Sequence, residues 1–216
     1  MWLEALAGIQ KHLITSTKFS KLKFVAELPS GIGGPLSPKM DHLVCFLPGC
    51  IALGATGGLT ESEAQGGPGW GFEQDQQMQL ARELMKTCWG MYKVTETGLA
   101  PEIAWFRADD AALQPRSEAL PLSHSKNSIF MWKKDYIVKP LDAHNLQRPE
   151  TVESLFMMWR VTKDPIYREW GWEIFNAFQK HTMLDDGKGY SSLDNVNIIP
   201  PPRRDNMESF WLVREV

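Results

Sequence analysis

The stretch that most constrains the fold is residues 145–154, which reads Asn-Leu-Gln-Arg-Pro-Glu-Thr-Val-Glu-Ser. Pro149 is favourable in the first turn of a helix, where its missing N–H has no partner to lose. Glu150 and Glu153 are three residues apart, so they lie on roughly one face of that helix. The apolar residues recur at helical spacing and form a second face: Val152, Leu155, Phe156 and Trp159. The sequence therefore predicts an amphipathic helix that begins at Glu150 with two carboxylates in its first turn.

The residues alone leave two interpretations of these carboxylates open. Acidic side chains are common in a first helical turn because the helix dipole favours negative charge there. Alternatively, Glu150 works together with Glu102, which also follows a proline, as a pair of positioned carboxyl groups. One protonated and one ionised carboxyl group are the minimum that glycoside hydrolysis requires.

The composition excludes several classes of protein. With 216 residues, 43% hydrophobic residues and a net charge of −3, the chain resembles an ordinary globular protein and is not basic enough to follow a nucleic-acid backbone. No run of apolar residues reaches the roughly 18 that a membrane span needs. Residues 1–16 lack the basic-then-apolar order of a signal peptide. We therefore expect no nucleic-acid partner and no membrane segment within this sequence.

Hydrophobic periodicity predicts a mainly α architecture built from helical hairpins. The predicted helices cover 1–17, 41–55, 73–95, 150–162 and 165–181, with a bend or break at Pro48-Gly49 in the second. The inner side of the helix at 73–95 is predicted to consist of Met78, Leu80, Leu84, Cys88, Met91 and Tyr92. Gly57–Gly71 is rich in glycine and acidic residues and is predicted to be a flexible insert. Short strands are predicted at 23–28 and within 128–140, and residues 107–126 are predicted to form a loop.

Other chemistries lack their sequence signals. The five histidines are scattered without a His-x₃-His pair, and Cys45 and Cys50 have no second cysteine pair, so a zinc site is not predicted. Residues 54–58 lack the lysine of a phosphate-binding loop. A serine nucleophile elbow is absent as well.

Several segments resemble, in order, the class I α-1,2-mannosidases of glycoside hydrolase family 47, and together they cover nearly the whole chain. The segments are His42–Gly49, Thr87-Cys88, Thr97–Ile103, Asp142–Ser154, Trp170–Glu173, Gly189–Ser192 and Asp205–Phe210. By this resemblance, residues 1–216 are the C-terminal part of one family 47 catalytic domain. The expected fold is a partial (α/α)₇ barrel of helical hairpins with short β segments in the loops.

The resemblance also implies a function. Family members remove α-1,2-linked mannose from N-glycans with inversion, depend on calcium, and work in the endoplasmic reticulum or Golgi lumen. Glu150 is then expected to be the general base and Glu102 a candidate proton donor. The expected sugar-pocket residues are His42, Arg148, Glu153 and Phe210, and Cys45 and Cys88 match the family's disulfide pair. The expected substrates are high-mannose N-glycans, and the full-length protein is expected to be membrane-anchored. The alternative is a non-catalytic member that binds mannose glycans or acts in glycoprotein degradation.

The chain departs from the family at both ends. The resemblance covers only the C-terminal half of a family domain, and Arg214 stands where the family has a glutamate. The family's calcium-binding threonine falls beyond Val216, so no metal ligand is expected in this chain. We therefore expect an incomplete fragment without turnover of its own. Its uncovered apolar side chains are expected to include Phe156, Trp159, Ile174 and Phe178.

Overall fold

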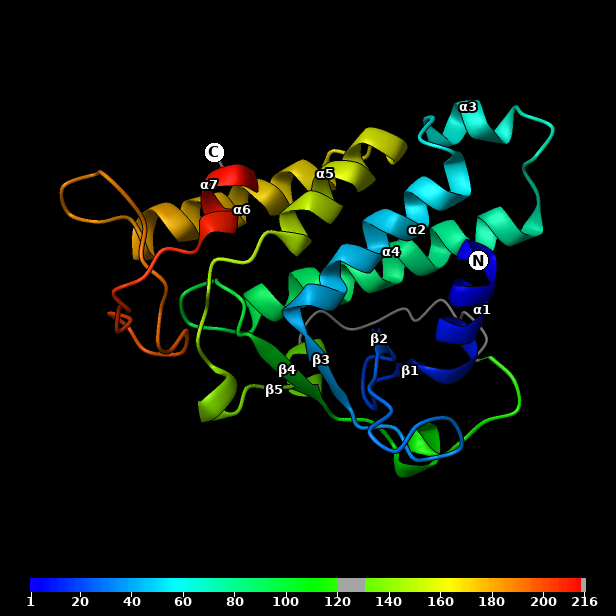
Figure 1. Cartoon of the computed structure of the whole chain (residues 1–216), viewed down its shortest axis with the longest axis horizontal. Coiled ribbons are helices and arrows are strands. Elements are labelled where there is room, and N and C mark those ends of the chain that lie inside the picture. Colours follow the sequence, from blue (N-terminus) through cyan, green and yellow to red (C-terminus); the bar gives the residue numbers. More distant parts are fainter. Residues whose placement is uncertain (120–130, 215–216) are drawn as a thin grey trace.

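The computed structural model describes residues 1–119 and 131–214, and it is mainly helical (Figure 1). The helices are α1 (Trp2–His12), α2 (Leu47–Thr56), α3 (Glu61–Gln65), α4 (Phe72–Lys93), α5 (Glu150–Thr162), α6 (Ile166–His181) and α7 (Ser209–Arg214). Short 3₁₀ helices are η1 (His42–Phe46), η2 (Asp110–Leu113), η3 (Trp132–Asp135) and η4 (Pro140–Asp142). The strands are β1 (Ile14–Ser16), β2 (Lys23–Val25), β3 (Lys39–Asp41), β4 (Ile103–Phe106) and β5 (Tyr136–Ile137).

Four helices form the main layer of the molecule. Helix α2 packs on both α4 and α5, and α5 packs in turn on α6. Figure 1 shows the long α4 running across the centre, with α2, α5 and α6 on one side of it and the strands on the other. The inner face predicted for α4 is confirmed, because all six of its members are buried: Met78, Leu80, Leu84, Cys88, Met91 and Tyr92. The predicted hairpin of α5 and α6 is also present, and Lys163 ends α5 with a left-handed φ of 60°.

The strands form two small sheets. Strands β1 and β2 make an antiparallel pair, and β3, β4 and β5 make an antiparallel sheet in that order. In the larger sheet Asp41 pairs with Ile103. This register brings the residues that follow Asp41 and precede Ile103 together, and these residues are His42 and Glu102.

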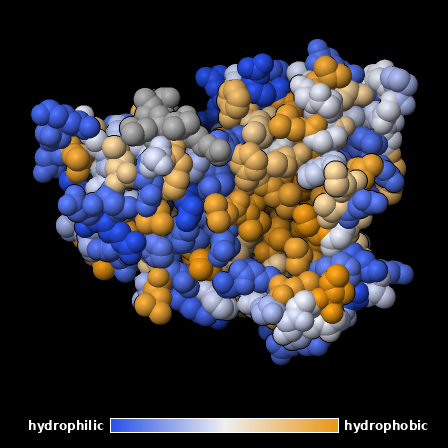
Figure 2. Space-filling model, viewed as in Figure 1, coloured by the Kyte–Doolittle hydropathy of each residue, from blue (hydrophilic) through white to orange (hydrophobic). Residues whose placement is uncertain are grey.

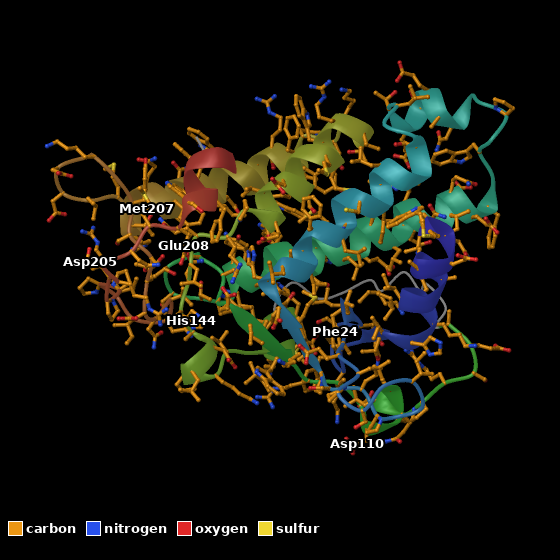
Figure 3. All side chains as sticks on the ribbon, in the orientation of Figure 1. Phe24, Asp110, His144, Asp205, Met207 and Glu208 are labelled. Atoms are coloured by element: carbon orange, nitrogen blue, oxygen red, sulfur yellow. A yellow bond between two sulfur atoms is a disulfide. The ribbon has the colours of Figure 1, made fainter. Side chains whose placement is uncertain are left out.

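The core lies between α4 and the strands. Phe24 of β2 is fully buried and stacks on Phe106 of β4, with ring centroids 4.3 Å apart. Figure 3 shows Phe24 under the middle of α4. Cys45 of η1 and Cys88 of α4 form a disulfide with Cα atoms 5.7 Å apart, as the family resemblance implied. This bond joins the start of the η1–α2 segment to α4.

The structure refines several local predictions. The helix predicted at 41–55 is divided beside Pro48, as predicted: η1 ends at Phe46 and α2 begins at Leu47. Pro48 lies in the first turn of α2, where a proline costs no hydrogen bond. The insert predicted to be flexible at 57–71 contains α3, whose start is fixed by a capping box between Thr60 and Glu63. The first helix stops at His12, because the chain enters β1 two residues later. Of the predicted strand region 128–140, the described part contains η3, β5 and the start of η4, and residues 120–126 of the predicted loop lie outside the described residues.

Part of the helical layer has an apolar surface. In Figure 2 an apolar area covers the position that α2 occupies in Figure 1. Among the apolar side chains of the η1–α2 segment, Leu43 is 50% exposed and Leu53 is 37% exposed. On α5, Phe156 is 57% exposed, as predicted. Ile174 and Phe178 were predicted to be uncovered, and this was wrong: both are 2% exposed, and Phe178 packs on Trp211 with ring centroids 4.8 Å apart.

The segment that contains η1, α2 and α3 is long and apolar. Among the described residues, His42–Gln65 is long and apolar enough to cross a membrane by length and composition alone, which the sequence analysis did not anticipate. Gly57 interrupts this segment with a φ of 62°, and α2 within it packs on α4 and α5. Helices of a protein core pass the same test, and the packing of α2 favours that interpretation.

Candidate functional site

Three segments that are distant in sequence meet at the start of α5. The backbone N–H of His42 donates to the carbonyl oxygen of Glu102 at 2.9 Å. The N–H of Glu102 donates in turn to the carbonyl oxygen of His144 at 2.8 Å. Figure 3 shows His144 and the segment of Asp205, Met207 and Glu208 at the same end of the molecule. The backbone thus fixes the ends of β3 and β4 against the chain that leads into α5.

Glu150 is held at this meeting point by His42. Nδ1 of His42 lies 2.9 Å from Oε2 of Glu150, across 108 residues of sequence. The His42 side chain is 2% exposed and that of Glu150 is 12% exposed. Burial by itself raises the pKa of Glu150, but the opposing causes, led by the hydrogen bond with His42, outweigh burial, so the pKa is lowered. Glu150 is therefore an ionised carboxylate at neutral pH, the form that can accept a proton.

Glu102 is held by Arg148 and not by Glu150. Nε of Arg148 donates to Oε1 of Glu102 at 2.5 Å, and both side chains are largely buried. The guanidinium of Arg148 also lies over the ring of Phe210, with its central carbon 5.6 Å from the ring centroid. Because the guanidinium N–H donates to it, Oε1 of Glu102 is the hydrogen-bond acceptor of this pair. Its expected role as a proton donor stays a prediction, and that role would require the pair with Arg148 to open.

The backbone before Arg148 is rigidly placed. Nδ2 of Asn145 donates to the carbonyl oxygen of Ala100 at 2.8 Å, and its Oδ1 accepts from the N–H of Gln147 at 3.0 Å. Asn145 also exchanges backbone hydrogen bonds with Leu193, both at 2.9 Å. Gln147 has a left-handed φ of 61°, which turns the chain so that Arg148 points at Glu102. A non-glycine residue in this conformation costs about 1 kcal/mol or more, and the surrounding hydrogen bonds hold it there.

Glu153 faces a different region from Glu150. It lines a hollow of about 760 Å³ between α5 and α6, together with Phe156, Phe178 and Trp211 among others. A neighbouring hollow of about 630 Å³ is lined mainly by apolar side chains of the same two helices. Neither hollow is lined by Glu150 or Glu102. We therefore place the candidate site by the contacts of Glu150 and Arg148, whereas Glu153 as a sugar-pocket residue stays a prediction.

The sequence analysis missed the partners of His42. Oη of Tyr92 lies 2.7 Å from Nε2 of His42, and Oγ1 of Thr151 lies 3.1 Å from the same nitrogen. Tyr92 was assigned to the apolar side of its helix without a polar role. The sequence did carry a signal for a polar role of Tyr92, because the hydroxyl of a buried tyrosine usually needs a hydrogen-bond partner. Asp41 was missed as well; among the described residues, its Oδ1 is buried without a hydrogen-bond partner.

The described residues do not fit a calcium site. A hard cation such as calcium takes six to eight oxygen ligands, several of them from carboxylates. Within residues 1–119 and 131–214, no group of three or more His, Cys, Asp or Glu side chains could hold a metal ion. One carboxylate oxygen of Glu150 and one of Glu102 are already bound to His42 and Arg148. We therefore derive no step through calcium from this chain.

The amino-acid sequence matches a known protein family and several curated proteins. A family model for glycosyl hydrolase family 47 matches residues 1–215. The chain is 51% identical to the mannosyl-oligosaccharide 1,2-alpha-mannosidase MNS3 of Arabidopsis thaliana, over 98% of its own length and 33% of that protein. It is 46% identical to the mannosyl-oligosaccharide 1,2-alpha-mannosidase of Candida albicans, over 98% of its own length and 35% of that protein. The chain thus spans about a third of the length of these curated relatives.

The fold of the chain also matches that of a solved structure. The structure superposes on an alpha-1,2-mannosidase from Trichoderma reesei with a TM-score of 0.73 and 24% identity, covering 99% of this chain and 39% of that one. The fold of that family is an (α/α)₇ barrel, so the helical hairpins described above are part of such a barrel. The chain belongs to glycosyl hydrolase family 47.

Proposed function

We propose that this chain supplies part of the active site of an inverting α-1,2-mannosidase acting on high-mannose N-glycans. The observation that supports this most is the environment of Glu150. Its carboxylate lies at the start of α5, keeps 12% exposure, and is bound by His42 while Arg148 lies nearby. An inverting glycosidase needs such an ionised carboxylate as the general base that removes a proton from the attacking water.

In this proposal the other residues bind and orient the sugar. Arg148 and Glu102 form a paired donor and acceptor beside the ring of Phe210. Sugar hydroxyl groups can exchange hydrogen bonds with both members of the pair, and the apolar face of the sugar can pack on the aromatic ring. In this proposal Glu102 acts as the proton donor once its pair with Arg148 opens when the sugar binds. The separation expected between an acid and a base in an inverting enzyme, about 6.5–9.5 Å, is a prediction for Glu102 and Glu150.

The setting of the reaction is proposed from the relatives. Proteins that match this chain include the endoplasmic reticulum mannosyl-oligosaccharide 1,2-alpha-mannosidases of Schizosaccharomyces pombe and Rattus norvegicus. We therefore propose the lumen of the secretory pathway, and the Cys45–Cys88 disulfide is consistent with its oxidising conditions. Calcium dependence and a membrane anchor of the full-length protein are proposed on the family relationship alone.

The test is a transplant of this chain into a relative. The matching third of the Arabidopsis thaliana mannosidase is replaced by residues 1–216, and release of mannose from a high-mannose N-glycan is measured. We expect the chimera to release α-1,2-linked mannose, because Glu150 and Arg148 are held in place by contacts within this chain. A folded chimera that binds the glycan without releasing mannose would contradict the proposal and support a non-catalytic binding protein instead.

A further inference from the structure

Both ring nitrogens of His42 contact polar side chains of the described residues. Among the described residues its Nδ1 contacts Glu150 at 2.9 Å, and its Nε2 contacts Tyr92 at 2.7 Å and Thr151 at 3.1 Å. The side chain is only 2% exposed. The sugar-binding role expected for His42 would therefore require a nitrogen that the protein already uses. These contacts permit His42 to act on the reaction through Glu150.

The partners of His42 come from two different helices. Tyr92 is in the last turn of α4 and is 1% exposed, whereas Thr151 and Glu150 begin α5. The rings of Tyr92 and His42 also meet edge to face, with centroids 5.7 Å apart. The imidazole is thus fixed in position and in orientation by groups that do not belong to its own segment.

We propose that Tyr92 is a positioning residue: its hydroxyl donates to Nε2 of His42, which places the ring proton on Nδ1, where it is donated to Glu150. A neutral imidazole has one donor nitrogen and one acceptor nitrogen, and the hydrogen bond at one of them decides which carries the proton. A phenol is a more acidic donor than the hydroxyl of a threonine. The shorter contact, 2.7 Å against 3.1 Å, agrees with Tyr92 as the donor.

The other two protonation states of His42 fit the contacts less well. With the proton on Nε2, the lone pair of Nδ1 would face the carboxylate of Glu150 at 2.9 Å, which is repulsive. With both nitrogens protonated, a full positive charge would lie against Glu150 and weaken it as a base. A neutral ring with its proton on Nδ1 holds the carboxylate without that charge.

The functional meaning of this arrangement rests on the proposed role of Glu150 as the general base. A base must keep enough proton affinity to take a proton from water, and it must point in one direction. The chain Tyr92–His42–Glu150 fixes the direction of the carboxylate from behind, and a neutral His42 lowers its proton affinity less than a charged imidazolium would. The protonation state of His42 is, however, a property of the folded chain and is measured without any substrate.

The test is nitrogen-15 NMR of the histidine side chains in the 216-residue chain. The His42 signals are assigned by replacing each of the other four histidines in turn. We expect Nε2 of His42 to give the signal of an unprotonated nitrogen and Nδ1 that of a protonated one near neutral pH. A protonated Nε2, either alone or together with a protonated Nδ1, would overturn the proposal.

Two variants separate the roles of the hydroxyl groups. Tyr92→Phe is expected to let the proton redistribute between the two nitrogens, whereas Thr151→Val, the matched control, is expected to leave it on Nδ1. The reverse pattern, or no change in Tyr92→Phe, would overturn the assignment to Tyr92. If Tyr92→Phe does not fold, fluorotyrosine is incorporated instead, because its stronger acid group is expected to shift the Nε2 signal; an unchanged signal would count against the proposal.

The outcome is independent of the transplant experiment. A chimera that releases no mannose would contradict the proposed function and leave the NMR result standing. An active chimera with a protonated Nε2 would contradict only the positioning role of Tyr92.

Discussion

Arg148 and Glu102 are 46 residues apart in sequence, and their side chains are joined by a hydrogen bond of 2.5 Å. The exposed fractions of the two side chains are 22% and 14%, so neither charge is well solvated. Removal of one partner leaves the other charge partly buried without compensation, which is more costly than removal of both.

We therefore expect Arg148→Met to lower the free energy of unfolding by about 2–3 kcal/mol. The double variant Arg148→Met/Glu102→Gln is expected to recover part of this loss, because the unpaired carboxylate is gone. Urea denaturation of the four proteins in the mutant cycle measures the coupling. Strictly additive losses would show that the pair makes no net contribution.

The disulfide between Cys45 and Cys88 is expected to be a main source of stability. It spans 43 residues, and the loop-entropy model assigns about 4 kcal/mol to a bridge of that length. Cys45→Ala/Cys88→Ala is therefore expected to lower the free energy of unfolding by about that amount, measured by denaturation without reductant. The control is Cys50→Ala, which leaves the bridge intact and is expected to cost less than half as much.

The remaining cysteine is expected to react slowly. Burial, followed by the charge of Glu153, raises the pKa of the Cys50 thiol, so less thiolate is present at a given pH. Its reaction with a thiol reagent at pH 8 is expected to be several-fold slower in the folded chain than in urea. Glu153→Gln is expected to accelerate it only modestly, because burial is the larger cause; a rate in the folded chain equal to that in urea would contradict this account.

Stability is expected to fall at both ends of the pH range. The lowered pKa of Glu150 stabilises the fold above the unfolded pKa of the carboxyl group, and this contribution is lost as the pH falls through the lower folded value. The pKa of Tyr167 is raised to about 12, chiefly by burial, so its contribution is complete below the unfolded value near 10 and is lost as the pH rises from there to about 12. The melting temperature against pH measures both limbs. Glu150→Gln should flatten the acid limb and Tyr167→Phe the alkaline limb, and an unchanged slope in either variant would contradict that assignment.

The sequence predicted the elements that depend on local pattern. The helix from Glu150, the buried face of α4 and the α5–α6 hairpin follow from the spacing of apolar side chains, and all three are confirmed. The break beside Pro48 was predictable too, because a proline is accepted in the first turn of a helix but not in its interior. The 3₁₀ geometry of His42–Phe46 before it was not predicted. The capping box at Thr60 was overlooked because glycines dominate the composition around it.

The contacts of the candidate site could not be predicted in the same way. The pairing of Asp41 with Ile103 depends on a sheet register set by residues from three distant segments. That register, and not any local motif, brings His42 beside Glu102. The partners of Glu150 and Glu102 could be found only in the folded chain, and so could the hydroxyl groups around Nε2 of His42.

The role of Glu150 as the general base is tested most directly by the kcat of the chimera with Glu150→Gln. The control is Glu73→Gln, which alters an exposed glutamate in the first turn of α4. We expect Glu150→Gln to lower kcat at least 100-fold with little change in KM, because the amide keeps the shape but cannot take a proton from water. We expect Glu73→Gln to leave both constants unchanged. A kcat within a few-fold of the parent chimera in Glu150→Gln would contradict the account.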